Sequence, residues 1–346
     1  MYDVVTIGSA TMDVFVESDE ANIVAVYTKN KKSEFMSYPY GAKIEINDFA
    51  SNVGGGGVNT AVNFANLGFK TSAVFKIGDD VYSEGILKYF KNKNVDLSNI
   101  IQDPGGSTGF SIILTSFQGD RTVLAHRGAN ADIKKSDINF DAIKQAKFLY
   151  IAPLNGSSSK IFDDVMDFAE KHGVQTCFNA GTTSIKKGYS YLKKVLETAE
   201  VVVMNKEEAS LATRIEIRQD TRGIKYSDEA IHPDIRKMCK KLKINNPQVI
   251  VITDGSAGAY AYDGADFYKC PVFEGSVVST LGAGDAFAST FCAALNKFGS
   301  VGRALMYASV NSAAAVSVFG ATEGLITFDE IEKRLSAKPD YKYLVC

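Results

Sequence analysis

The chain has 346 residues, with 38 Lys and Arg against 40 Asp and Glu, so its formal net charge at pH 7 is −2. This balance excludes a generally basic nucleic-acid-binding protein. Apolar residues make up 45% of the chain and charged residues 23%, the mix of a globular protein with a large core rather than of a disordered or collagen-like chain. The 29 glycines, set against only 7 prolines, are therefore expected at particular turns.

The five cysteines are odd in number and widely spaced, and they form no Cys-x-x-Cys pair. Such spacing is typical of reduced thiols in an intracellular protein. Asp3 stands where a signal peptide would carry a basic residue, and no uncharged apolar stretch approaches the roughly 18 residues that span a bilayer. We therefore expect a cytoplasmic protein that has neither a membrane nor nucleic acid as a partner.

Short apolar runs rich in β-branched residues alternate along the chain with segments of helical periodicity. The predicted buried parallel strands are Val4 to Gly8, Thr71 to Ile77, Phe148 to Ile151, Gln175 to Asn179, Val201 to Met204 and Val249 to Thr253. The predicted helices are Val58 to Leu67, Tyr82 to Asn92, Ser158 to His172, Tyr189 to Ala199, Pro233 to Leu242, Asp285 to Lys297 and Val301 to Val318. Strand followed by helix, repeated, predicts a single α/β sandwich domain over residues 1–346.

Two stretches depart from this alternation, Phe15 to Asn52 and Thr108 to Arg127. Apolar and polar residues alternate from Lys43 to Phe49 in the first stretch and around Gln118-Gly119-Asp120 in the second. We expect antiparallel strands with one solvent-exposed face, the second stretch being a hairpin that turns at Gly119-Asp120. The segments at about 14–52 and 108–127 would form a small β-layer that covers a cleft as a lid, and its open edges could pair in a homodimer.

The first glycine cluster is Gly54-Gly55-Gly56-Gly57, which runs directly into the predicted helix at Val58-Asn59. Glycines let the backbone approach a ligand closely, beside the unpaired N–H groups of a helix start. The Asn59 amide both donates and accepts hydrogen bonds, which suits the hydroxyls of a polyol. Asn59, Asn63 and Asn66 share one helix face, so a glycine-rich turn with a solvated asparagine face is an equal alternative. The Rossmann and Walker phosphate-loop patterns are not matched.

The second glycine cluster is Gly282-Ala283-Gly284, followed by the predicted helix that begins at Asp285. Unpaired amides at such a helix N-terminus stabilise an anion, for example a phosphoryl group in transfer. The Asp285 carboxylate lies in the first turn, where it could take a proton from an attacking hydroxyl. The alternative is a helix cap behind a flexible turn. The apolar and small residues that follow favour a buried helix, which places the carboxylate deep in the fold.

The two clusters, taken in order, resemble the two signatures of the ribokinase-like (PfkB) carbohydrate kinases: Gly-Gly-x-Gly-x-Asn-x-Ala followed by Leu-Gly, and Thr-x-Gly-Ala-Gly-Asp-Ala-Phe. The resemblance covers nearly the whole chain, and it implies a three-layer α/β sandwich with a mostly parallel central sheet and a small β-sheet lid. It implies Asp285 as the general base and the amides of Gly282, Ala283 and Gly284 as an anion hole. The substrate-binding residues that it implies are Asp13, Gly54, Gly55 and Asn59.

The same resemblance implies ATP and Mg²⁺ as cofactors. Asn205-Lys-Glu-Glu208 resembles the family's phosphate and magnesium motif, in which Glu208 would hold Mg²⁺ through water. The other nucleotide-binding residues that it implies are Thr253, Gly255 and Gly258 at a strand end and Asn311 beside the adenine. Arg127-Gly-Ala-Asn130 is a further match, directly after the lid hairpin.

Some of these residues also have a purely structural interpretation when taken singly. Asp13 could be a turn residue, Glu208 an exposed helix charge, and Asn311 a polar position in a helix of small residues. Finding all of the matches in one order favours the functional interpretation.

Two departures from the family pattern bear on the substrate and the ions. Ser279 stands where potassium-activated members carry Asp, so a monovalent cation requirement stays open. Val62 stands where members that act on phosphorylated sugars often carry Arg, which favours a non-phosphorylated substrate, although Lys43 and Arg127 could supply charge.

The sequence thus predicts ATP-dependent transfer of the γ-phosphate to a hydroxymethyl group of a free sugar or nucleoside, as in ribokinase, fructokinase or adenosine kinase. A sugar-phosphate kinase of the phosphofructokinase-B kind and a catalytically silent sugar or nucleotide sensor are the alternatives.

Overall fold

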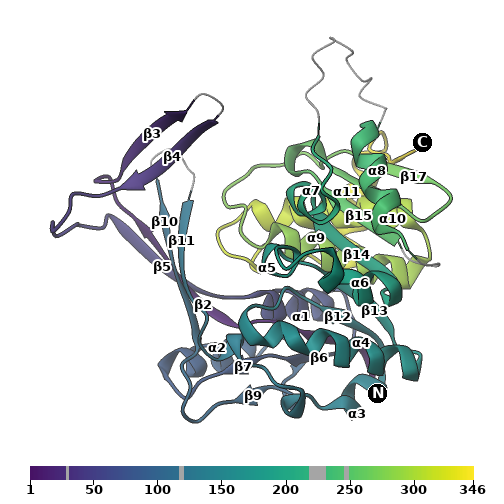
Figure 1. Cartoon of the computed structure of the whole chain (residues 1–346), viewed down its shortest axis with the longest axis horizontal. Coiled ribbons are helices and arrows are strands. Elements are labelled where there is room, and N and C mark those ends of the chain that lie inside the picture. Colours follow the sequence, from purple (N-terminus) through teal and green to yellow (C-terminus); the bar gives the residue numbers. More distant parts are fainter. Residues whose placement is uncertain (29–30, 117–120, 218–230, 245–248) are drawn as a thin grey trace.

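The computed structural model describes residues 1–28, 31–116, 121–217, 231–244 and 249–346 (Figure 1). A large sheet forms the centre of the molecule. Its strands lie in the order β18 (Leu344–Val345), β17 (Phe267–Cys270), β16 (Ala259–Tyr262), β15 (Val249–Thr253), β14 (Val201–Asn205), β13 (Gln175–Asn179), β12 (Ala146–Ile151), β1 (Tyr2–Ile7), β6 (Thr71–Val74) and β8 (Val95–Asp96). Neighbouring strands from β15 to β8 are parallel, and β16, β17 and β18 extend one edge in antiparallel fashion.

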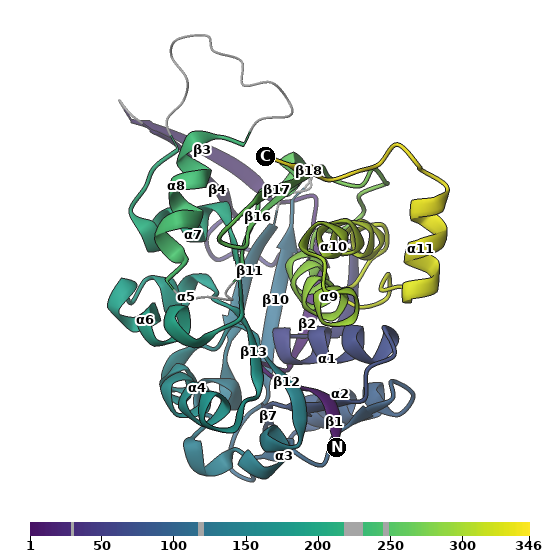
Figure 2. The ribbon, with the colours of Figure 1, turned by 90° about the vertical axis from the view of Figure 1, so that its right-hand side faces the viewer.

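Alternate residues of each central strand face opposite layers of helices. On β12, Leu149 and Ile151 belong to one hydrophobic cluster, whereas Phe148 and Tyr150 belong to another on the opposite face. Figure 2 shows the sheet between the two helical layers. The first layer holds α3 (Phe140–Lys144), α4 (Ile161–His172), α5 (Thr182–Ile185), α6 (Tyr189–Thr198), α7 (Lys206–Thr213) and α8 (Pro233–Leu242). The second holds α1 (Gly56–Asn66), α9 (Ala283–Phe298), α10 (Val301–Val316) and α11 (Phe328–Ser336), and α2 (Val81–Phe90) packs beside α1.

The α/β sandwich predicted from the sequence is confirmed, with small shifts of the element bounds. The predicted strand at 71–77 is divided, because β7 (Lys76–Ile77) leaves the large sheet and pairs with β9 (Ile101–Gln102). The predicted helix at 158–172 begins as a 3₁₀ turn, Gly156–Lys160, before α4. Four helices, α3, α5, α7 and α11, and the antiparallel edge strands were not predicted from the sequence.

A second, four-stranded sheet forms the lid, in the order β11 (Arg121–His126), β10 (Gly109–Thr115), β2 (Thr11–Glu17) and β5 (Asp48–Gly54). Both outer pairs are antiparallel, but β2 and β10 are parallel to each other. The expectation of antiparallel strands throughout is therefore wrong for the central pair. Both central strands leave the α/β body in the same direction, as Figure 1 shows, so they pair in parallel.

Two further details of the lid differ from the sequence-based expectation. The alternating segment from Lys43 to Phe49 forms no strand before Asp48, because its apolar side chains have no core to face, and Ile46 is half exposed. Instead, β3 (Asn22–Thr28) and β4 (Lys31–Ser37) form a separate hairpin that projects beyond the lid sheet (Figure 1). The predicted turn at Gly119-Asp120 lies outside the described residues. Within the described ranges, no helix combines the length and apolar character needed to cross a bilayer.

Candidate active site

Asp13 and Gly54 lie side by side on the paired lid strands β2 and β5. The Asp13 side chain is buried, at 8% exposure, and the Ser111 hydroxyl donates a 2.5 Å hydrogen bond to its Oδ1. A side chain at Gly54 would collide with the other carboxylate oxygen of Asp13. Burial raises the pKa of the Asp13 carboxyl, and the hydroxyls of Ser111 and Thr11 lower it. The sequence-predicted pair is therefore brought together, and Asp13 is a buried strand residue rather than a turn residue.

The glycine cluster at the start of α1 packs backbone against backbone on the loop that follows β1. Gly55 has a φ of +97°, and a Cβ there would lie 2.6 Å from the carbonyl oxygen of Ser9. Gly57 N donates to the same oxygen at 2.9 Å. Side chains at these positions would separate the two segments. The cluster is thus a close approach of two backbones that brings the start of α1 to the carboxyl end of β1.

Asn59, in the first turn of α1, contacts the predicted base directly. Its Nδ2 donates to Asp285 Oδ2 at 2.8 Å. The Asn59 side chain is 6% exposed, and its Oδ1 has no hydrogen-bond partner among the described residues. A buried amide oxygen without a partner is costly unless a ligand or water donates to it. The expected alternative of a solvated asparagine face is wrong for Asn59 and Asn63, which are both buried.

The second glycine cluster forms the N-terminus of α9 with Gly282 as the N-cap residue. Gly282 has a φ of +76°, and a Cβ there would lie 2.7 Å from the carbonyl oxygen of Ala321. The first intrahelical bond runs from Ala286 N to Gly282 O, at 2.8 Å. The amides of Ala283, Gly284 and Asp285 precede that bond, and a Cβ at Gly284 would have no atom within 4 Å. These amides therefore have no intrahelical acceptor, and they lie at the positive end of a 16-residue helix.

Asp285 is only partly exposed, and the residues of α9 directly behind it, from Ala286 to Ala294, are buried. Burial raises the pKa of Asp285, while the hydrogen bond from Asn59 opposes this and lowers it. A carboxylate in such a setting is a stronger base when ionised than one in water. A Cβ on Gly56 would lie 3.6 Å from Asp285 Oδ1, so the backbone of the first glycine cluster reaches the predicted base as well.

Asn205 and Glu208 form a capping box at the start of α7. Glu208 N donates to Asn205 Oδ1 at 2.8 Å, and Asn205 N donates to Glu208 Oε2 at 3.1 Å. The other carboxylate oxygen of Glu208 accepts from the Thr182 hydroxyl at 3.0 Å. Glu208 is 7% exposed, so it is not an exposed helix charge.

The surroundings of Glu208 can be compared with what a magnesium ion requires. No group of three or more His, Cys, Asp or Glu side chains within the described ranges could hold a metal ion. Because both oxygens of the Glu208 carboxylate already accept hydrogen bonds, this side chain fits a hydrated Mg²⁺ held through water. It does not fit an ion bound directly by several carboxylates.

The nucleotide-side residues of β15 lie beside this motif. Thr253 is in register with Asn205 at the carboxyl ends of β15 and β14. Gly258 has a φ of +94°, and a side chain there would collide with the carbonyl oxygen of Cys270. Lys206 forms an ion pair with Asp254 across the same edge. The structure therefore brings the motif on α7 and the end of β15 together, as expected for open α/β sheets.

Asn311 is the exception among the predicted nucleotide-binding residues. Its side chain is fully buried, donates to Asn63 Oδ1 and Thr290 Oγ1 at 2.9 and 2.8 Å, and accepts from Ile326 N at 3.0 Å. It therefore lies between helices in this structure, with its amide atoms already hydrogen-bonded, and its predicted contact with the nucleotide stays a prediction. Ala321, in the segment that follows α10, approaches the site through its contact with Gly282.

Two contacts between the lid and the α/β body were not predicted from the sequence. Arg121 Nη1 on β11 donates to Thr280 Oγ1, just before the second glycine cluster, at 2.6 Å. The rings of Phe15 on β2 and Phe319 lie 4.5 Å apart between centroids. The alternating pattern predicted the lid strands, but it did not indicate which face would meet the body. Arg121 thereby joins the lid to the predicted anion hole.

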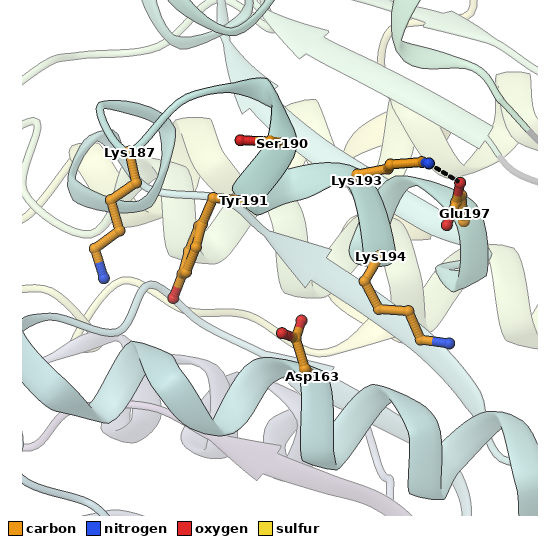
Figure 3. A pocket seen from close by; sticks show the side chains of 7 residues that line it. All are labelled: Asp163, Lys187, Ser190, Tyr191, Lys193, Lys194 and Glu197. Atoms are coloured by element: carbon orange, nitrogen blue, oxygen red, sulfur yellow. Dashed lines mark ion pairs between the residues drawn. The ribbon is translucent and has the colours of Figure 1, made fainter.

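A hollow of about 480 Å³ lies elsewhere, between α4 and α6 (Figure 3). Lys193 pairs there with Glu197 at 3.6 Å, and Lys194 pairs with Asp167 and Glu170 at 2.7 and 2.9 Å. Its charges are therefore largely balanced, and none of the predicted site residues lines it. The candidate active site lies instead at the carboxyl edge of the sheet, where the lid meets α1 and α9.

The sandwich, its lid and the carboxylate in the first turn of a glycine-led helix are the features of a ribokinase-like fold. A model of the pfkB family of carbohydrate kinases matches residues 1–327, and the chain belongs to this family.

Individual relatives are more distant. A 5-dehydro-2-deoxygluconokinase from Geobacillus thermodenitrificans is 27% identical over 297 residues, which cover 82% of this chain and 84% of the relative. Among solved structures, Arabidopsis thaliana ribokinase complexed with ribose and ATP superposes with a TM-score of 0.77, at 20% identity over 96% of this chain and 98% of the other. Burkholderia thailandensis nucleoside kinase in complex with inosine gives 0.75, at 16% identity over 98% and 99% of the two chains.

Proposed function

We propose that this protein is an ATP-dependent kinase that phosphorylates a hydroxymethyl group of a free sugar or nucleoside. The observation that carries the proposal is the position of Asp285. Its carboxylate accepts a 2.8 Å hydrogen bond from Asn59 and belongs to the first turn of α9, whose leading amides have no intrahelical acceptor. A proton acceptor and an anion-stabilising set of amides at one point are what transfer of a phosphoryl group to an alcohol requires.

The substrate hydroxyls would lie between the lid and the start of α1. Asp13 would accept hydrogen bonds from a polyol, and the backbone of Gly54 and Gly55 lets the sugar approach closely. Asn59 Oδ1, which lacks a partner among the described residues, would accept from a further hydroxyl. An aliphatic or aromatic ligand would leave this oxygen unpaired, so the site favours a substrate that donates hydrogen bonds there.

Asp285 would remove the proton from the attacking hydroxymethyl oxygen, an effect typically worth about 10² to 10⁴ in rate. The amides of Gly282, Ala283 and Gly284 would stabilise the charge on the phosphoryl oxygens, each such donor being worth about 10² to 10³ in kcat in other enzymes. ATP would supply the phosphoryl group, and Mg²⁺ would neutralise its phosphates near Asn205 and Glu208. Thr253, Gly255 and Gly258 would flank the nucleotide.

We further propose that the chain is one domain whose lid excludes water when substrate is bound, which would suppress wasteful hydrolysis of ATP. The edges of the lid sheet at β5 and β11 and the exposed apolar residues of the β3–β4 hairpin, among them Tyr27 and Phe35 at 73% and 55% exposure, support pairing of two lids in a homodimer. Light scattering of the purified protein, compared with a Tyr27→Lys, Phe35→Lys variant, tests this: a monomer in both cases contradicts it.

The charge at the substrate position separates the proposal from a sugar-phosphate kinase. Position 62, where many sugar-phosphate kinases of the family carry Arg, is a valine in this chain, and it is fully buried in α1. This position therefore supplies no cation for a substrate phosphate. The name of the Geobacillus relative adds a sugar acid as a candidate acceptor. A silent sensor is less well supported, because Asp285 is present and is held in place by Asn59.

The test is ADP release with Mg-ATP against ribose, fructose, 2-keto-3-deoxygluconate, 5-dehydro-2-deoxygluconate, adenosine, inosine and fructose 6-phosphate. We expect turnover with at least one non-phosphorylated acceptor. Turnover with fructose 6-phosphate alone would establish the sugar-phosphate alternative. Binding of sugar and nucleotide by calorimetry without ADP release would establish the sensor. The same panel with and without K⁺ decides the question raised by Ser279.

A further inference from the structure

Two asparagines on α1, one turn apart, hold the first turns of α9. Asn59 donates to the side chain of Asp285, as described above. Asn63 is fully buried, and its Nδ2 donates to Ser289 Oγ at 2.7 Å and to Thr290 Oγ1 at 2.9 Å, with Ala286 O at 3.4 Å. The two residues therefore contact α9 on successive turns, one at the predicted base and one directly behind it.

The contact of Asn63 extends to the backbone of the predicted base. Ser289 Oγ accepts from Asn63 and donates in turn to Asp285 O at 2.5 Å. The Asp285 residue is thus held twice from α1, at its carboxylate by Asn59 and at its carbonyl by Asn63 through Ser289. Thr290 also accepts from Asn63 and is fully buried like Ser289, but no bond from Thr290 to Asp285 occurs among the described residues.

Asn311 on α10 completes the network. It donates to Asn63 Oδ1 at 2.9 Å, and its own Oδ1 accepts from Ile326 N at 3.0 Å. The amide oxygen and nitrogen of Asn63 are thus both satisfied, which distinguishes Asn63 from Asn59, whose oxygen is left for a ligand. A fully satisfied buried network is rigid and directional, whereas apolar packing is neither.

Directionality matters here because α9 presents mostly small residues. Ala286, Ala288, Ala293 and Ala294 are all buried in it, and packing of such residues resists sliding weakly. The hydrogen bond between Asn59 and Asp285, at 2.8 Å, would be lost after a displacement of about 1 Å. Misplacement of a catalytic group by about 1 Å can lower a rate by about 10².

We propose that Asn63 is a positioning residue for the phosphotransfer reaction: it fixes α9 against α1 so that Asp285 meets Asn59 and the substrate hydroxyl. Asn63 itself touches neither substrate nor nucleotide. The inference rests on the proposed role of Asp285 as the base, and it adds a residue that lies within neither glycine cluster.

The first test compares Asn63→Leu with the neighbouring control Thr290→Val. Both variants remove hydrogen bonds from the same buried network and keep the number of side-chain heavy atoms, but only the first breaks the connection to Asp285. We expect Asn63→Leu to lower kcat by about 10- to 100-fold, with the KM for ATP changed by less than about 3-fold. We expect Thr290→Val to keep kcat within about 3-fold at a similar loss in Tm. Equal losses of kcat in both variants, in proportion to Tm, would overturn the proposal.

The pH profile of kcat supplies a readout that general destabilisation does not move. Burial and Asn59 are the influences that set the pKa of Asp285, and Asn59 lowers it. If Asn63→Leu releases α9, the Asn59 hydrogen bond weakens, the pKa of Asp285 rises, and the acid limb of the profile moves to higher pH. Thr290→Val should leave the limb where it is. An unmoved limb in Asn63→Leu contradicts the proposal.

Two further measurements keep the proposal testable in every case. If Asn63→Leu does not fold, Ser289→Ala removes the bond to Asp285 O while leaving Asn63 in place, and it carries the same expectations. Hydrogen exchange of the peptide 282–290 reports on positioning without any turnover: it should be faster in Asn63→Leu or Ser289→Ala than in Thr290→Val. Faster exchange in Asn63→Leu would support the positioning role even if Asp285→Asn stayed active, whereas an active Asp285→Asn would refute the base assignment. Failure of the positioning role and failure of the base assignment are therefore distinguishable.

Discussion

Asn59 and Asp285 stand 226 positions apart in the sequence, yet the Asn59 amide donates a 2.8 Å hydrogen bond to the Asp285 carboxylate. The two residues open the helices α1 and α9, and each helix is preceded by glycines whose backbone packs closely on another segment. The proposed substrate side and the proposed phosphoryl side of the site are therefore joined at one carboxylate.

Removal of the charge at Asp285 should abolish phosphotransfer without unfolding the protein. Asn is nearly isosteric with Asp but cannot accept the proton, so we expect Asp285→Asn to lower kcat by about 10² to 10⁴ while ATP still binds. ADP release and calorimetric titration with ATP measure the two effects. Asp266→Asn, an exposed change near β17, is the control and should be silent. Near-normal turnover of Asp285→Asn would refute the base assignment.

The same variant should gain stability at neutral pH. Burial raises the pKa of Asp285 in the folded protein, so the folded state binds a proton more tightly than the unfolded state does. The ionised carboxylate therefore destabilises the fold at pH values above its raised pKa, and this penalty vanishes below about pH 3.9, the ordinary pKa of Asp.

Asp285→Asn should accordingly show a higher Tm than the parent protein at pH 7. The difference should shrink as the pH falls through the raised pKa. Thermal unfolding of both proteins between pH 4 and pH 8 measures this, and a Tm difference that grows towards low pH would contradict the assigned direction of the shift.

The two glycines of the second cluster should respond differently to alanine. Gly282 has a φ of +76° and no room for a Cβ beside Ala321, so Gly282→Ala should lower both activity and stability, the strain alone costing about 1 to 2 kcal/mol. Gly284 is helical and faces open space, so Gly284→Ala should not destabilise the fold.

If that open space receives the phosphoryl group, the new methyl group in Gly284→Ala should still reduce kcat, by about 10-fold or more. Chemical denaturation and ADP release, measured on both variants, separate the two effects. Full activity of Gly284→Ala would show that the amides of this turn do not line the reaction centre.

The buried strands of the large sheet could be predicted because parallel strands covered on both faces are continuous apolar runs, as at Val249–Thr253. The lid could be predicted only as alternating segments, since a period of two indicates a half-exposed strand but not the direction of its partner. That is why the parallel pairing of β2 with β10 was missed. The alternation from Lys43 to Phe49 formed no strand at all before Asp48, because no core lies beneath it.

Within the site, the glycine clusters were recognisable because close backbone approaches and positive φ angles, as at Gly55 and Gly282, require glycine at particular positions. The burial of Asn63 and Asn311 was not recognisable, because the residues that satisfy them include Ser289 and Thr290, which carry no charge and no motif. Asparagines along one face of a helix give the same sequence pattern whether that face is exposed to water or packs against another helix. The packing of α1 against α9, which are far apart in the sequence, decides whether the asparagine face is exposed or buried.

The contact between Arg121 and Thr280 should control closure of the lid. Arg121 Nη1 donates to Thr280 Oγ1 at 2.6 Å, directly before the proposed anion-binding turn, so closing the lid would bring a positive charge to the proposed phosphoryl side. Arg121→Ala should raise the KM for the sugar or nucleoside several-fold and increase ATP hydrolysis relative to acceptor phosphorylation, because water enters an incompletely closed site. Arg121→Lys keeps the charge but loses the planar geometry of the guanidinium. We expect this variant to reverse part of the rise in KM and little of the excess ATP hydrolysis.

Thr280→Val, which removes only the acceptor of the hydrogen bond, serves as the matched control. Both Arg121→Ala and Thr280→Val break the same hydrogen bond. Equal effects of the two variants would show that this hydrogen bond controls lid closure, whereas a larger effect of Arg121→Ala would show that the charge of Arg121 does. Unchanged KM and coupling in both variants would show that this contact plays no part in closure.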